Sequence, residues 1–112
     1  MKQILPLPEN KKLLVTYRVE PGCLGPSGAE HISKFCEFTQ AKIQSLDDDY
    51  IIWDITPRND KTLPEMQYSV LGKRITQTQA EKYLAVFGKN LDEFEGHLVD
   101  HLAVLIDEYM KP

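Results

Sequence analysis

The sequence predicts an α+β fold in which a three-stranded mixed sheet is covered on one face by helices. Apolar and polar residues alternate, as in strands, over Leu13–Val19 and Glu65–Leu71, and a short, strongly apolar run over Tyr50–Thr56 predicts a third strand between them. Apolar residues at helical spacing follow Leu13–Val19 and also Glu65–Leu71. The resulting order, β-α-β-β-α-α, is that of a split β-α-β (ferredoxin-like) sheet without its last strand. We expect the first two strands to be parallel and the last two to form an antiparallel hairpin.

Length and composition indicate an ordinary globular protein. A chain of 112 residues, 42% apolar and 27% charged, is expected to form one domain over residues 1–112. A net charge of −4 argues against nucleic acid and anionic membranes as partners. No apolar run approaches the roughly 18 residues of a membrane span, and the first ten residues do not resemble a signal peptide. We therefore expect a cytoplasmic protein with free thiols.

The first half of the chain supplies two strands and one helix. Residues 1–10 are expected to be extended, because two prolines limit their pairing to a sheet edge. A capping box of Ser27 and Glu30 predicts the start of the first helix. Its apolar face is formed by Ile32, Phe35, Cys36, Thr39, Ile43 and Leu46. Asp47–Asp49 are expected to form a solvated turn, because they lack the spaced ligands of a calcium loop. The strongly apolar strand Tyr50–Thr56 is predicted to be central.

The second half supplies one strand and two helices. Residues Pro57–Pro64 are predicted to be a loop before the strand Glu65–Leu71, and Trp53 and Tyr68 are expected to lie in the core. A second capping box, Thr78 to Glu81, predicts a helix that ends near Gly88. Asn90 is expected to cap the last helix. The apolar stripe of that helix consists of Leu91, Phe94, Leu98, Leu102, Leu105 and Tyr109.

A three-stranded sheet with helices on one face leaves an unpaired edge and a bare face. Three further apolar residues, Phe38, Ala103 and Val104, lie off the helical stripes. A homodimer or a protein partner would cover these surfaces. The alternative is that the N-terminal segment covers the edge and the monomer is complete. We therefore predict a small non-enzymatic protein-interaction or regulatory domain without a cofactor.

A second hypothesis places a small-molecule or redox site in the loop after the first strand. The carboxyl ends of parallel strands share one edge, so Cys23 and Ser27 are expected near Arg58 and Asn59. A nearby guanidinium would favour the Cys23 thiolate. The competing interpretation is a tight turn in which Cys23 fills a small space. The loop matches neither phosphate-binding glycine pattern.

No metal site is expected. Cys23 and Cys36 are spaced too widely for a zinc knuckle, and Cys36 lies on the apolar helix face as a buried, inert thiol. His97 and His101, one turn apart on the last helix, come closest to a pair of ligands. Their acidic neighbours indicate an exposed helix surface instead.

Overall fold

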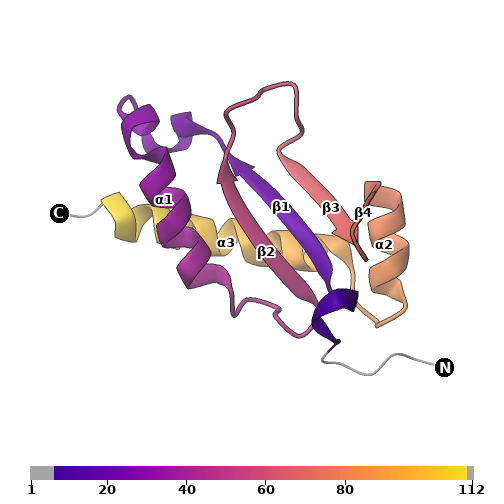
Figure 1. Ribbon diagram of the computed structural model, residues 1–112. Helices are drawn as coiled ribbons and strands as arrows, with labels where there is room; N and C mark the ends of the chain where they lie inside the picture. The colour runs from indigo at the N-terminus through magenta and orange to yellow at the C-terminus, as the bar shows by residue number, and fades with distance from the viewer. Residues whose placement is uncertain (1–6, 111–112) are drawn as a thin grey trace.

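The computed structural model describes residues 7–110, leaving aside the side chain of Cys23. Its main elements are β1 (Leu13–Val19), α1 (Gly28–Ile43), β2 (Ile51–Pro57), β3 (Met66–Val70), β4 (Lys73–Ile75), α2 (Gln77–Ala85) and α3 (Leu91–Met110). Short 3-10 turns span Glu9–Lys11 and Pro21–Leu24. The first overlaps the end of the segment 1–10 that was expected to be extended, and residues 1–6 of that segment lie outside the described residues. The predicted α+β class, with a mixed sheet and helices, is confirmed (Figure 1).

The sheet has four strands in the order β2-β1-β3-β4, so the prediction of three strands is wrong. The strand β1 is central. It pairs in parallel with β2, as predicted, and Leu13 lies opposite Ile51. On its other side it pairs antiparallel with β3, where Val15 lies opposite Tyr68. The predicted hairpin between the second and third strands is therefore wrong, and so is the ferredoxin-like analogy.

The connection between β2 and β3 explains this order. Residues 58–65 form a longer link than most hairpin loops, and they carry the chain past the end of β1 (Figure 1). Arg18 on β1 fixes this link through two contacts. Its Nη1 donates to the Pro64 carbonyl at 2.8 Å, and its backbone N–H donates to the Glu65 carbonyl at 2.8 Å. The strand predicted to be central consequently lies at the edge.

The additional strand β4 follows a two-residue turn. Leu71 and Gly72 have φ values of 52° and 77°, the positive values that suit two-residue hairpin turns. Leucine rarely adopts positive φ, so the sequence carried only Gly72 as a signal for this turn. Tyr68 and Ile75 are paired across the resulting hairpin.

One buried cluster joins one face of the sheet to all three helices. On β1 this face consists of Leu13, Val15, Tyr17 and Val19, which are all buried. At its centre, the Phe94 ring of α3 meets the rings of Trp53 and Tyr68 edge-on, at centroid distances of 5.9 and 6.4 Å. Trp53 and Tyr68 are both buried, as predicted, although β1 lies between the strands β2 and β3 that carry them.

The opposite face of the sheet is largely polar. Thr16 Oγ1 donates to Asp54 Oδ2 at 3.4 Å, and Arg18 Nη2 donates to Gln67 Oε1 at 2.9 Å. Because side chains alternate along a strand, these groups point away from the apolar core. This is the face of the sheet that was predicted to carry no helices, and side-chain hydrogen bonds join its strands.

The first helix begins without the predicted capping box. The Ser27 side chain makes no cap hydrogen bond among the described residues, and its φ of −96° and ψ of 13° are not the extended values of an N-cap. The turn that starts at Gly25, with φ of 88°, places Ser27 in this conformation. Gly28 follows directly, and a Cβ atom there would lie 1.7 Å from the Pro21 carbonyl oxygen.

The second helix begins two residues earlier than predicted. Its capping box joins Thr76 and Gln79, because Thr76 is the extended residue that directly follows β4. The predicted box from Thr78 to Glu81 is therefore wrong. The predicted end of the second helix near Gly88 and the predicted capping of the last helix by Asn90 are both confirmed. Gly88 has φ of 74°, and Asn90 Oδ1 accepts from the Glu93 N–H at 2.7 Å.

Candidate functional site

The loop predicted to hold a reactive thiol is a compact turn. The Gly25 N–H donates to the Gly22 carbonyl at 3.2 Å, and the Gly28 N–H donates to the Gly25 carbonyl at 3.0 Å. Ser27 is exposed beside them. The side chain of Cys23 lies outside the described part of the chain. Its reactivity therefore stays a prediction, and so does a small-molecule site around it.

Arg58 binds a carboxylate of its own chain. Its guanidinium is bonded to Glu20, and Lys61 approaches the same carboxylate at 3.6 Å. The hydrogen bond from Arg58 lowers the pKa of Glu20. Arg58 Nη2 also donates to the Leu63 carbonyl at 3.2 Å, and Asn59 is exposed. Arg58 thus ties the end of β1 to the link between β2 and β3.

The two histidines of α3 make separate contacts. A hydrogen bond of 2.9 Å joins His97 Nδ1 to Asp47 Oδ2 in the turn before β2. His101 Nδ1 lies 3.1 Å from the His97 carbonyl oxygen. Within residues 7–110, with the Cys23 side chain set aside, no group of three or more His, Cys, Asp or Glu side chains could hold a metal ion.

The His97–Asp47 pair is expected to make stability depend on pH. The hydrogen bond that the Asp47 carboxylate accepts from His97 raises the pKa of His97 above 6.5, with Glu93 and Asp100 acting in the same direction. A raised pKa in the folded state stabilises the fold fully below pH 6.5, and this stabilisation is lost as pH rises through the folded-state pKa. Urea unfolding should therefore show a larger stability difference between wild type and His97→Gln in mildly acidic than in mildly alkaline buffer.

The matched control for this experiment is Asp47→Asn. Asp47 has φ of 52°, which asparagine also tolerates, so the turn can form without the carboxylate. In this background the pH dependence of the His97→Gln effect should be much smaller, because only the weaker influence of Glu93 and Asp100 on the pKa of His97 remains. A pH dependence that is undiminished in Asp47→Asn would contradict the assignment to this pair.

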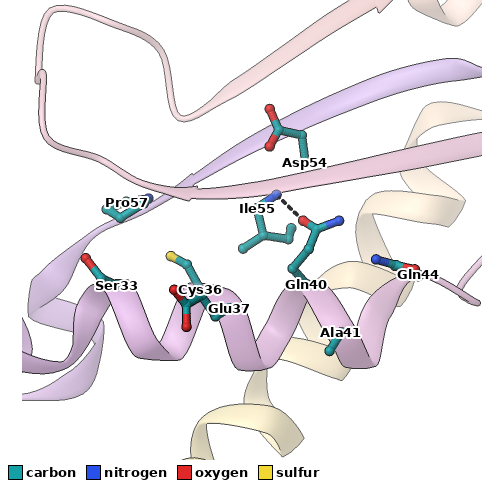
Figure 2. Close-up of a pocket in the computed structure, with 9 residues that line it drawn as sticks. All are labelled: Ser33, Cys36, Glu37, Gln40, Ala41, Gln44, Asp54, Ile55 and Pro57. Carbon is teal, nitrogen blue, oxygen red and sulfur yellow. Dashed lines mark hydrogen bonds between the residues drawn. The ribbon is translucent and has the colours of Figure 1, made fainter.

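A groove runs between α1 and the outer edge of β2, and Figure 2 shows its larger part, with a volume of about 500 Å³. Gln40 of α1 crosses it. The Gln40 amide donates to the Trp53 carbonyl at 2.8 Å and accepts from the Ile55 N–H at 2.7 Å. Cys36 lines the groove, and burial raises the pKa of its thiol to about 11. Cys36 is buried, as predicted, and a thiol with a raised pKa is a poor nucleophile.

The helix α3 carries a second apolar stripe besides the buried one. Its members, at alternating intervals of three and four residues, are Gly96, Val99, Ala103, Ile106 and Met110. We call these five residues the outer stripe. Val99 is 64% exposed and Met110 is 49% exposed, while Ile106 is partly buried. This spacing is that of a helix–helix seam, and the stripe is exposed at Val99, Ala103 and Met110.

A hollow of about 170 Å³ adjoins the outer stripe at Val99. Its apolar wall includes Met66 of β3 together with Leu98 and Leu102 of α3. Two carboxylates stand at its rim, and each accepts a hydrogen bond from a tyrosine. Tyr17 Oη donates to Glu65 at 3.1 Å, and Tyr68 Oη donates to Glu95 at 2.7 Å. The hollow therefore combines an apolar wall with two carboxylates that tyrosine hydrogen bonds hold in position.

Apart from its two histidines, every charged side chain of α3 is acidic. The helix contains no Lys or Arg, and its acidic residues are Asp92, Glu93, Glu95, Asp100, Asp107 and Glu108. The outer stripe is thus an apolar surface with acidic borders. The sequence contained this signal, because the three-and-four spacing can be read directly from it. Of the residues predicted to lie off the stripes, Ala103 and Val104 are exposed, whereas Phe38 contacts Tyr109 at 5.6 Å between ring centroids.

No family model, curated protein or solved structure matches this chain. Among residues 7–110, no helix has the length and apolar character needed to cross a membrane.

Proposed function

We propose that this protein is an interaction domain that binds a basic amphipathic helix of a partner protein. The outer stripe of α3 and the adjoining hollow form the docking surface. The observation that carries the proposal is the exposure of Val99, Ala103 and Met110 at the spacing of a helix–helix seam. Exposed apolar surface arranged in this way is typical of helix-binding sites.

The chemistry of the partner follows from the borders of the stripe. A second copy of α3 would bring acidic side chains against acidic side chains, which is unfavourable. A partner helix with Lys or Arg beside its apolar face would instead be attracted. The stem of such a side chain fits the wall formed by Met66 and Leu98, and its charge reaches Glu65 or Glu95.

The proposal is tested with a designed peptide and a pair of matched variants. The probe is a fluorescein-labelled helical peptide of leucine and lysine, and an otherwise identical peptide of leucine and glutamate is its control. Val99→Asp places a charge in the outer stripe. Val104→Asp adds the same charge to the same helix, about 140° away around its axis, at a valine that is 57% exposed.

We expect the lysine peptide to bind and the glutamate peptide not to bind. Val99→Asp should weaken binding by about 30-fold, as at an interface hot spot worth about 2 kcal/mol. Val104→Asp should change the Kd by less than about twofold, because it keeps the outer stripe intact. Equal effects of the two variants would contradict the proposal. A wild-type dimer that Val99→Asp dissociates would assign the outer stripe to a second copy instead.

A further inference from the structure

The two edges of the sheet differ in how well they are protected. At one edge lies β4, which has three residues and exposes Lys73 and Arg74. Short, charged edge strands resist pairing with another chain. At the other edge lies β2, which spans Ile51–Pro57 and is predominantly apolar. The groove beside α1 follows this edge, so β2 is the edge that another strand could approach.

Gln40 occupies the position of a missing strand. In a parallel sheet, one residue donates to the carbonyl before its partner residue and accepts from the N–H after it. The Gln40 amide makes both bonds around Asp54. It donates to the Trp53 carbonyl and accepts from the Ile55 N–H, and Figure 2 shows the second of these bonds. One side chain thus reproduces the pairing of a parallel strand residue opposite Asp54.

We propose that the groove between α1 and β2 is a second binding site, which takes an extended basic peptide as a parallel strand beside β2. In this state the peptide backbone replaces the Gln40 amide at the Trp53 carbonyl and the Ile55 N–H. Addition of a strand to a sheet edge is an established mode of peptide recognition. This site uses none of the residues of the outer stripe, so it goes beyond the function proposed above.

The groove offers space on both sides of Gln40. Towards Pro57 its volume is about 500 Å³, and towards Ile51 a second hollow of about 320 Å³ continues along the strand. Both hollows are lined by Gln40 and Gln44. Displacement of the Gln40 side chain would join them along the length of β2.

The charges along the groove select a basic peptide over a second copy of this chain. Glu37 and Asp54 line the larger hollow, and Glu9 and Asp48 line the smaller one. Lys12 is the basic residue lining them, and it is paired with Glu9 at 3.1 Å. Two β2 strands related by a two-fold axis would be antiparallel, whereas the Gln40 bonds follow the parallel pattern.

The test is an NMR titration of ¹⁵N-labelled full-length protein with a blocked peptide of alternating valine and lysine. The matched peptide is N-methylated at every second residue and therefore lacks half of its backbone donors. We expect the unmethylated peptide to shift the amide signals of residues 51–57 and the side-chain NH₂ signal of Gln40. The methylated peptide should bind at least about tenfold more weakly, because two or more backbone hydrogen bonds worth about 1 kcal/mol each are lost.

Two substitutions test the roles of the amide and of the charge. Gln40→Ala removes the competing amide and should tighten binding about fivefold, the factor that corresponds to about 1 kcal/mol. Glu37→Gln leaves Gln40 in place and should weaken binding about threefold, whereas Glu81→Gln, on exposed α2, should not change it.

Equal affinity for the methylated and unmethylated peptides would overturn the proposal, as would shifts centred outside β2 and α1. Weaker binding by a folded Gln40→Ala would also overturn it, because Gln40 would then bind the peptide rather than compete with it. If Gln40→Ala does not fold, the test is the affinity of Glu37→Gln and of Glu81→Gln for the unmethylated peptide. Equal affinities of these two variants would reject the site. None of these outcomes bears on the outer stripe, which has its own probe and variants.

Discussion

Replacement of Phe94 by alanine is expected to lower the free energy of unfolding by about 3–5 kcal/mol. Phe94 is fully buried, and its ring contacts both Trp53 and Tyr68 edge-on at the centre of the core. Truncation leaves a cavity beneath the central strand and removes both ring contacts. The surrounding rings cannot collapse freely, because hydrogen bonds from Trp53 Nε1 to the Leu46 carbonyl and from Tyr68 Oη to Glu95 hold them in place.

Urea unfolding followed by circular dichroism measures this loss. Phe38→Ala is the matched control, because Phe38 is only partly buried where it packs against Tyr109. Its loss should be about 1 kcal/mol, in proportion to the smaller area that it buries. A loss for Phe94→Ala no larger than that for Phe38→Ala would show that α3 does not pack on the sheet as described.

The second large effect is expected at Gly28. Alanine there should lower the free energy of unfolding by about 1–3 kcal/mol, as overpacking does. The added Cβ would lie 1.7 Å from the Pro21 carbonyl oxygen and 2.7 Å from its carbonyl carbon, so the backbone must move. Helix propensity alone gives the opposite sign, because alanine is favoured over glycine by about 1 kcal/mol inside a helix.

Gly96→Ala is the control for Gly28→Ala. Gly96 is exposed on α3, and a Cβ atom there would meet no described atom within 4 Å. This variant should therefore gain up to about 1 kcal/mol from helix propensity. A gain in stability for both variants would contradict the close approach of the Pro21 turn to the start of α1.

The sequence was sufficient to locate the main elements. The alternation over Leu13–Val19 matches β1, and the apolar stripe that begins at Ile32 matches the buried face of α1. These patterns are local, because each reflects which side of an element meets the core. The parallel pairing of β1 with β2 was also predictable, since a helix connects the two strands.

The pairing order was not predictable in the same way. It depends on whether residues 58–65 turn back beside β2 or pass the end of β1. The contacts of Arg18 with Pro64 and Glu65 favour a path past the end of β1, and they form only in the folded chain. The turn at Leu71 and the N-cap of α2 at Thr76 were missed for a related reason. Pairing with β3 imposes positive φ on a leucine, and the start of α2 depends on where β4 ends.

One of the candidate sites could be predicted from the sequence, whereas the others depend on contacts that exist only in the folded chain. The outer stripe of α3 could be read from the spacing of Val99, Ala103 and Ile106 once the buried stripe was known. The role of Gln40 could not be read, because it depends on α1 lying along the edge of β2. The Arg58 side chain, predicted near a thiol, is bonded to Glu20, a residue that the sequence did not single out.

We propose above that a basic helix binds to the outer stripe of α3. The most direct test is to map where the leucine–lysine peptide binds, by following backbone amide shifts of the ¹⁵N-labelled protein during a titration. We predict the largest shifts at Gly96, Val99, Ala103, Ile106 and Met110, and at Met66 beside the hollow. Shifts centred on the polar face of the sheet or around Val104, with the outer stripe unchanged, would contradict the claim.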